Sequence, residues 1–321
     1  MPRKVIIDCD PGVDDAMTLC AALFDPRLEV LAVTAVAGNC SAEISTRNVQ
    51  TIVDELDPPL RPRVGVATEP DDGLPVRGRF RNGADLLNDL STFASLLHNR
   101  HPSEKVICDV VRMHEPGAVT LLTLGPLTNL ARAFSRDPEL SSMIGHIVMV
   151  GGSTQAKGNV TPTAEYNIYC DPSAARQVFR SLSTKTLVPL DVTNRISLSL
   201  DMADQMPDTK TKVGEIIRHI LPKAFRGYRQ EYGCERIHIH DFVGYLALVR
   251  PDLFTTEQMA GDVETSGDLT QGMTVFDRRD MGWGKNMDVC LELDKETLLK
   301  EVLTTLNQAA EKWNEANNQD T

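Results

Sequence analysis

The sequence predicts an α/β protein in which a mainly parallel central sheet is flanked by helices and followed by a C-terminal strand-rich part and a final helix. Two kinds of segment predict this fold class. Short apolar runs rich in Val and Ile are typical of strands buried on both faces, and amphipathic segments of helical spacing alternate with them. No internal repeat or linker divides the chain. We therefore expect one domain over residues 1–321, although a length prior of about 150 residues per domain would suggest two.

Composition and charge narrow the class of protein. The chain is 41% hydrophobic and 24% charged, as ordinary globular proteins are. Its net charge of -12 argues against a nucleic-acid or membrane partner, because phosphate binding needs clustered Lys and Arg. The seven cysteines include no CxxC pair, which fits a reducing compartment. With no run long enough for a signal peptide or membrane span, we expect a cytoplasmic protein.

The first elements are a strand, a tight turn and a helix. Residues 5–7 form a short apolar run of strand type, which Pro11 and Gly12 end. Apolar residues then recur at the i, i+3, i+4 and i+7 positions of a helix: Ala16, Leu19, Cys20 and Leu23.

Four aspartates lie around this turn: Asp8, Asp10, Asp14 and Asp15. One Asp at a helix start is usually a cap, and two are often a solvated first turn. Four carboxylates within eight residues repel one another and raise each other's pKa. A bound cation relieves that repulsion. Because the cluster offers only oxygen ligands, a hard cation such as Ca²⁺ or Mg²⁺ is the favoured interpretation.

The rest of the chain continues the alternation, which makes the parallel part Rossmann-like. A long segment at 57–92, rich in Pro, Gly, Arg and Asp, is predicted to be irregular apart from a short strand near Val64. Strands are expected at 28–39, 118–125, 146–152 and 185–192, and later near 258–264, 272–277 and 287–293. Helices are expected at 42–56, 103–115, after Pro126, at 171–182, within 200–235, at 241–249 and at 295–314.

Polar residues follow several of these strands, at the edge where open α/β sheets bind ligands. Asn39 follows the second strand, and alone it is better explained as a turn residue. After the 118–125 strand, Pro126 cannot donate a hydrogen bond, which leaves the Leu124 carbonyl available to a cation. A simple strand–helix turn explains that segment about equally well.

Two further polar groups come later in the chain. Asn159, Glu165 and Asn167 lie in a segment that could be merely a loop, but carboxylate and amide groups suit ligands rich in hydroxyls. Asp241 precedes an apolar helix, where an N-cap is the leading explanation in isolation. Its neighbour His240 could be a surface or core histidine.

The run Asp8-Cys9-Asp10-Pro11-Gly12-Val13-Asp14-Asp15-Ala16 closely resembles the DxDPGxDDA signature of the inosine–uridine-preferring nucleoside hydrolases. Later segments resemble the same family in the same order, so the resemblance spans nearly the whole chain. These segments are residues 37–39, 125–129, 150–152, Asn159 with 164–167, 240–241 and 270–277.

The resemblance implies hydrolysis of the N-glycosidic bond of ribonucleosides to ribose and free base, with one Ca²⁺ in the site. By similarity, the Ca²⁺ ligands are the Leu124 carbonyl, where the family often has Thr, and the side chains of Asp10, Asp15 and Asp241. The positions that match ribose-binding residues are Asp14, Asn39, Asn159, Glu165, Asn167 and Asp241.

The resemblance also implies a mechanism. Departure of the base leaves an oxocarbenium-like ribose, which nearby carboxylates stabilise. Asp10 is the expected general base for a water that Ca²⁺ orients, and His240 resembles a histidine placed near the leaving base. Possible base contacts are Asn82, Val150 and Tyr228. A homodimer or homotetramer is expected by resemblance alone.

Two other functions remain compatible with the residues. A metal-dependent phosphatase of the DxD type would also use Asp8 and Asp10, but it needs a phosphate-binding nest and a Lys that the sequence does not place. A non-catalytic ribonucleoside-binding protein could keep the same scaffold, although the full set of Asp and Asn residues argues against lost activity.

Overall fold

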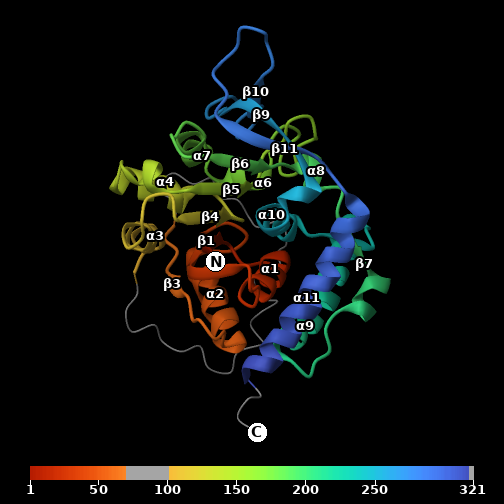
Figure 1. Cartoon of the computed structure of the whole chain (residues 1–321). Coiled ribbons are helices and arrows are strands. Elements are labelled where there is room, and N and C mark those ends of the chain that lie inside the picture. Colours follow the sequence, from red (N-terminus) through yellow and green to blue (C-terminus); the bar gives the residue numbers. More distant parts are fainter. Residues whose placement is uncertain (70–100, 318–321) are drawn as a thin grey trace.

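The computed structural model describes residues 1–69 and 101–317. Within them, one large sheet forms the centre of the molecule (Figure 1). Its strands lie in the spatial order β10 (Thr274–Asp277), β9 (Phe254–Val263), β11 (Met287–Leu293), β6 (Lys185–Val188), β5 (His146–Val150), β4 (Val119–Thr123), β1 (Arg3–Cys9), β2 (Leu28–Ala35) and β3 (Arg63–Gly65). Neighbouring strands are parallel except where β9 pairs with β11 and with β10.

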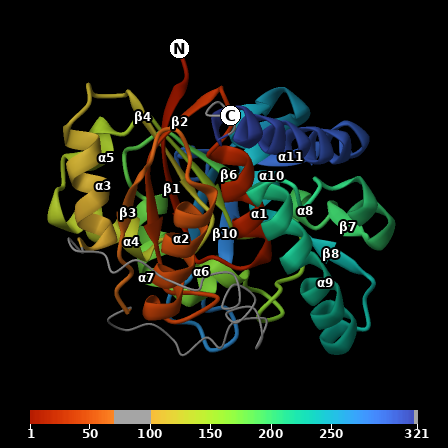
Figure 2. The same cartoon turned by 90° about the horizontal axis from the view of Figure 1, so that it is seen from below.

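Helices cover both faces of the sheet, as Figures 1 and 2 show. Each face buries its own hydrophobic layer. On one face lie α1 (Val13–Ala22), α2 (Ala42–Leu56), α9 (Lys212–Tyr232), α10 (His240–Val249) and α11 (Lys295–Asn317). On the other lie α3 (Ser103–Arg112), α4 (Thr128–Arg136), α5 (Leu140–Met143) and α7 (Pro172–Phe179). This arrangement confirms the predicted α/β class.

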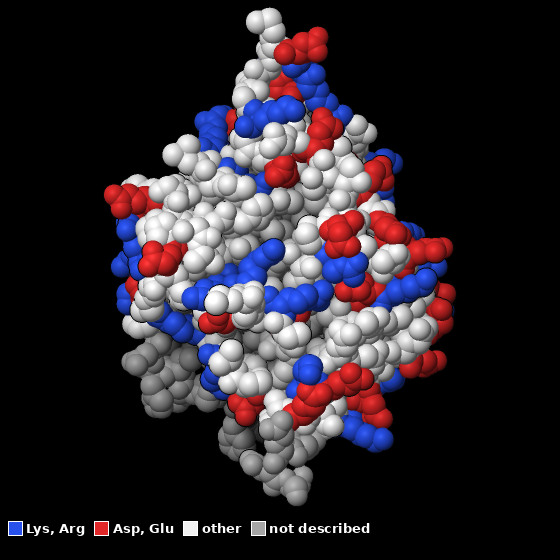
Figure 3. All heavy atoms as spheres, viewed as in Figure 1, with Lys and Arg blue, Asp and Glu red and all other residues white. Residues whose placement is uncertain are grey.

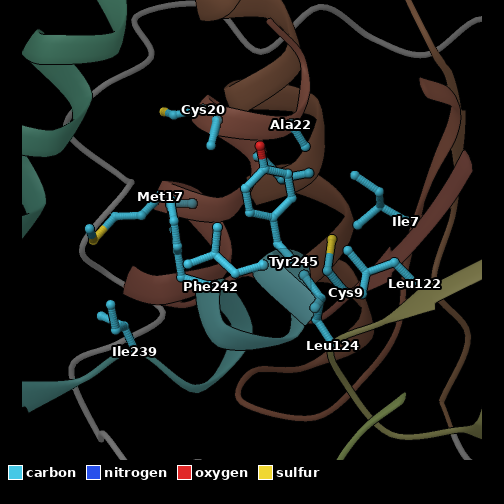
Figure 4. Packing of buried hydrophobic residues seen from close by; sticks show 14 of the residues in the cluster. Ile7, Cys9, Met17, Cys20, Ala22, Leu122, Leu124, Ile239, Phe242 and Tyr245 are labelled. Carbon is cyan, nitrogen blue, oxygen red and sulfur yellow. The ribbon is translucent and has the colours of Figure 1, made fainter. Parts of the chain in front are cut away.

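The central strand β1 contributes to both layers. Val5, Ile7 and Cys9 belong to the layer under α1, whereas Ile6 belongs to the opposite layer. Alternation along a strand explains this, and burial on both sides explains why β1 reads as a continuous apolar run. In the first layer, Phe242 and Tyr245 of α10 pack edge to face among side chains of α1, β1 and β4 (Figure 4).

The strand order places a topological switch point beside β1. From β1 the chain proceeds outward to β2 and β3, and it then returns to β4 on the other side of β1. Connections therefore leave β1 and β4 in opposite directions, which opens a crevice at their carboxyl ends. Asp10 follows β1 and Leu124 follows β4, so the strand order brings these two predicted site residues together.

The structure corrects several predicted boundaries. The strand expected at 185–192 ends at Val188, and a short helix α8 (Leu190–Thr193) follows. Apolar runs of this length do not distinguish strand from buried helix, and here Leu190 N–H donates to the Gly152 carbonyl. The segment expected to be a loop at 158–167 runs into another short helix, α6 (Tyr166–Cys170).

The other differences lie in the second half of the chain. Only α9 of the region 200–235 is α-helical; before it come β7 (Ser197–Ser199) and the 3-10 helix η2 (Leu200–Gln205). β7 pairs with β8 (Arg236–His238) in a small separate sheet. After α10 and the 3-10 helix η3 (Pro251–Leu253), β9 begins at Phe254 rather than near 258. The C-terminal strands extend the main sheet, because β11 pairs with β6.

Candidate active site

Three carboxylates from two helix starts converge beside the switch point. Asp14 and Asp15 lie in the first turn of α1, and Asp241 lies in the first turn of α10. Each offers an oxygen within 4.8 Å of the others. Asp15 Oδ2 accepts a 2.9 Å hydrogen bond from Gly12 N–H, and Asp14 Oδ2 accepts one of 3.3 Å from Asp241 N–H. The positive ends of two helix dipoles therefore face this cluster.

Asp10 lies next to this group, where two glycines allow its carboxylate to fit. Its Oδ2 accepts a 2.6 Å hydrogen bond from Asn39 N–H. A Cβ at Gly125 would lie 2.7 Å from Asp10 Oδ1, and a Cβ at Gly38 would overlap Oδ2. Larger residues at either position would displace the carboxylate.

Burial and mutual repulsion make these carboxylates costly to ionise. Burial, followed by the charge of Asp14, raises the pKa of Asp15 to about 7. Burial raises the pKa of Asp10 well above its usual value, and the charge of Asp15 adds to that effect. The pKa of Asp241 is raised in the same way, by burial and then by Asp14. Asp15 Oδ1 is also buried with no hydrogen-bond partner among the described residues. An all-oxygen cluster with an unpartnered buried oxygen fits a hard cation.

Asp8 does not join the cluster, although it lies in the same sequence motif. Its Oδ1 accepts hydrogen bonds from Thr34 Oγ1 at 2.6 Å and from Asn129 Nδ2 at 2.8 Å. Asn129 also donates to the Ala35 carbonyl at 2.8 Å. Burial raises the pKa of Asp8 to about 7. Asp8 and Asn129 thus connect β1, β2 and α4 beneath the site.

A pocket opens beside the acidic cluster and gathers most of the predicted site residues. Its walls include Asp14, Asn39, Leu124, Val150, Asn159, Glu165, Asn167, Tyr228, His240 and Asp241. Asp10 and Asp15 are buried and lie outside this lining. Asn82, a predicted base contact, falls outside the described residues.

Hydrogen bonds fix the polar side chains on one wall. Glu165 caps α6: its carboxylate accepts from the N–H groups of Asn167, Ile168 and Gly152. Gly152 adopts a left-handed φ of 68°, which a glycine tolerates best. Asn159 Oδ1 accepts from the N–H of Tyr166 at 2.8 Å.

The Leu124 carbonyl has a partner that the sequence did not reveal. Asn167 Nδ2 donates to it at 2.6 Å and to the Val150 carbonyl at 3.0 Å. A carbonyl oxygen has two lone pairs, so this contact still leaves acceptor capacity for a cation. The N-cap explanation of Asp241 is wrong. Ile239 is the N-cap of α10, and Asp241 lies inside the first turn of that helix.

His240 occupies the pocket together with residues that sequence reasoning missed. Its Nδ1 lies 2.8 Å from Thr193 Oγ1, and its ring stacks on His238 with centroids 5.4 Å apart. His238 and Lys223 also line the pocket. His238 ends β8 and His240, two residues later, begins α10. In an extended segment this spacing places two side chains on one face. Thr193 gave no signal, because its segment resembled the end of a strand.

Comparison with known proteins decides the family. Residues 5–300 match the family described as inosine-uridine preferring nucleoside hydrolase. The chain belongs to this family. It is 35% identical to a non-specific ribonucleoside hydrolase of Escherichia fergusonii over 316 residues, which cover 97% of this chain and all of the relative. It is 37% identical to uridine nucleosidase 1 of Arabidopsis thaliana, over 88% of this chain and 84% of the relative.

Solved structures agree with this assignment. The purine-preferring ribonucleoside hydrolase from Gardnerella vaginalis superposes with a TM-score of 0.85 at 28% identity, covering 96% of this chain and 99% of that one. A plant nucleoside hydrolase gives the same values. This nucleoside hydrolase is therefore an N-ribosyl hydrolase, an enzyme class that acts on N-glycosidic bonds. The relatives' names differ in the preferred base, so membership of the family leaves base preference open.

Charged side chains of both signs lie on the surface of the molecule. On the face shown in Figure 3, basic and acidic side chains are interspersed. Across the described ranges, 1–69 and 101–317, none of the helices combines the length and apolarity needed to cross a membrane.

Proposed function

We propose that this nucleoside hydrolase is Ca²⁺-dependent and cleaves purine ribonucleosides, pyrimidine ribonucleosides or both to ribose and free base. One observation carries the proposal. The carboxylates of Asp14, Asp15 and Asp241 converge at a pocket whose walls also carry amide groups, a glutamate and a histidine. A cation site and a site for a hydroxyl-rich ligand are therefore adjacent.

The proposed Ca²⁺ ligands are the side chains of Asp10, Asp15 and Asp241 and the Leu124 carbonyl. All are oxygen donors, as Ca²⁺ requires, and Asp15 Oδ1 has no other partner among the described residues. When bound, the cation would supply positive charge that offsets carboxylate repulsion, binds hydroxyls and makes a water more acidic. Asp14, whose oxygen lies in the same cluster, is proposed to bind ribose.

The ribose would be held by side chains that the protein has already oriented. The proposed ribose contacts are Asp14, Asn39, Asn159, Glu165, Asn167 and Asp241. Carboxylates accept hydrogen bonds and amides can donate as well as accept, which matches the dual character of hydroxyl groups. The carboxylates also lie where positive charge develops as the base departs, and they would stabilise it.

Two residues are proposed to handle protons. Asp10 is the general base that takes a proton from the attacking water, and Asn39 N–H holds its carboxylate in place. His240, which Thr193 Oγ1 contacts at Nδ1, would donate a proton to the departing nitrogen of the base. Val150 and Tyr228 line the same pocket and are proposed base contacts.

We also propose that residues 1–321 act as one domain and assemble as a homodimer or homotetramer. Pairing of β11 with β6 and of β1 with β2 in one sheet supports the single domain. Light scattering coupled to size-exclusion chromatography would measure the assembly.

The experiment that tests the activity is ribose release from inosine, guanosine, adenosine, uridine and cytidine. We expect release from at least one of them, with free base formed in equal amount. Failure to cleave any of the five, by protein shown to bind Ca²⁺, would contradict the proposed substrate class.

A further inference from the structure

Lys223 lies in the wall of the pocket that α9 forms. Four residues of α9 line the pocket: Lys223, Ala224, Gly227 and Tyr228. Among the described lining residues, Lys223 is the one lysine or arginine. Neither the proposed cation site nor the proposed ribose contacts use it.

His219 helps to orient this lysine. Lys223 Nζ lies 2.7 Å from His219 Nε2, one turn earlier on α9. An ammonium group can only donate hydrogen bonds, so Nε2 of His219 is the acceptor. The half-buried lysine stem is thereby held against the helix, which reduces the entropy lost when the ammonium binds a ligand.

The pocket has a wall suited to ribose and another suited to a base. Asp14 and Asp241, from α1 and α10, provide carboxylates for hydroxyl groups. The wall from α9 and β8 instead offers Lys223, Tyr228 and His238. Aromatic rings and a cation suit a flat heterocycle with an acceptor on its edge.

We propose that Lys223 sets base specificity by donating a charge-assisted hydrogen bond to a carbonyl oxygen on the base. This inference rests on the proposed function and specifies its substrate. Inosine carries a carbonyl at C6 where adenosine carries an amino group, and uridine and cytidine differ in the same way at C4. An amino group at that point would bring its own N–H donors against the ammonium donors. Bases with the carbonyl are therefore preferred.

The test compares kcat/KM for inosine with adenosine, and for uridine with cytidine, in wild type and in Lys223→Met. Wild type should prefer inosine and uridine by at least about tenfold, because a site built to hydrogen bond one group rejects an analogue that lacks it. Lys223→Met should lose about tenfold or more on inosine and uridine, and less than about threefold on adenosine and cytidine. Lys223→Arg keeps a cationic donor and should retain most of the preference.

Controls separate this inference from the proposed function. Lys210 is an exposed lysine just before α9, and Lys210→Met should leave all four substrates unchanged. Equal losses of Lys223→Met on both members of each pair, or no loss, would overturn the role of Lys223. If wild type shown to bind Ca²⁺ cleaved neither these four nor guanosine, the proposed function would fail. Equilibrium binding of inosine and adenosine to Asp10→Asn would then test the lysine: binding that favours inosine and depends on Lys223 would support it, and equal binding would overturn it.

Discussion

The backbone N–H of Asn39 donates a 2.6 Å hydrogen bond to Oδ2 of Asp10 and thereby joins the turn after β2 to the end of β1. The other oxygen of Asp10 faces Gly125, in the turn after β4. The turns after three neighbouring strands, β4, β1 and β2, therefore determine the direction in which this carboxylate points. Such fixed orientation is what a general base needs, because proton transfer depends on reach before it depends on pKa.

Replacing Asp10 with Asn should remove most turnover while the fold is kept. The amide oxygen can still accept the hydrogen bond from Asn39, but it cannot take a proton. We expect kcat to fall by about 10²- to 10⁴-fold. Ribose release measures the loss, and calorimetry should show that much of the Ca²⁺ binding remains. Near-normal turnover in this variant would rule out Asp10 as the base.

Gly125→Ala should impair catalysis by moving Asp10. The new Cβ would lie 2.7 Å from Asp10 Oδ1 and 2.7 Å from Val36 Cγ1, and both contacts are too short to keep without a shift. A misplaced base should cost about 10²-fold in kcat. Gly284→Ala is the matched control, because nothing lies within 4 Å of a Cβ there. If the two alanine variants had the same activity, the close fit around Asp10 would have no catalytic role.

His240→Ala should affect substrates according to how much their leaving group needs a proton. Inosine and uridine release basic nitrogen anions, whereas nitrophenyl riboside releases an anion that is stable without protonation. We expect losses of about 10²-fold or more in kcat on the nucleosides and much smaller losses on the nitrophenyl substrate. Equal losses on both kinds of substrate would remove His240 as the acid.

Stability without metal should fall as pH rises from about 4 to about 7. Burial raises the pKa of Asp15 from 3.8 to about 7, so in this range the folded state keeps a proton that the unfolded state has lost. Ionising the carboxylate therefore costs folding free energy. Thermal unfolding of chelated protein measures this, and Asp15→Asn should show a weaker pH dependence.

Calcium should reverse that trend, because a bound cation favours ionised carboxylates. The rise in Tm on adding Ca²⁺ should be larger near pH 7.5 than near pH 5. A Ca²⁺ effect that is the same at both pH values, or absent, would argue against a cation among these carboxylates.

Local sequence pattern was sufficient for the N-terminal part of the site. An apolar run, a Pro-Gly break and helical spacing all fall close together, and they predicted β1, the turn and α1. Placement of Asp14 and Asp15 in the first turn of the helix followed directly. The predicted strands 28–39 and 118–125 are shorter in the structure, so Asn39 and Leu124 lie in the turns after β2 and β4. Both turns were still expected at one edge, because parallel strands end at the same edge of a sheet.

The local sequence pattern did not show that Asp8 lies outside the acidic cluster that other aspartates form. Its partners Thr34 and Asn129 come from a neighbouring strand and from α4, and only the assembled sheet brings them to it. Thr193 was missed for a related reason. The apolar run 187–192 has the pattern of a strand, but tertiary packing makes its second half the short helix α8. Contacts between residues far apart in the sequence cannot be predicted from the local sequence pattern.

We propose that one Ca²⁺ among Asp10, Asp15 and Asp241 is required for cleavage of the N-glycosidic bond. The most direct measurement is a titration of chelator-stripped protein with Ca²⁺, following bound metal and ribose release together, for wild type and Asp15→Asn. We predict that activity returns in proportion to one bound Ca²⁺ per chain, and that Asp15→Asn needs far more Ca²⁺ to regain it. Full ribose release from protein shown to be free of metal would contradict the claim.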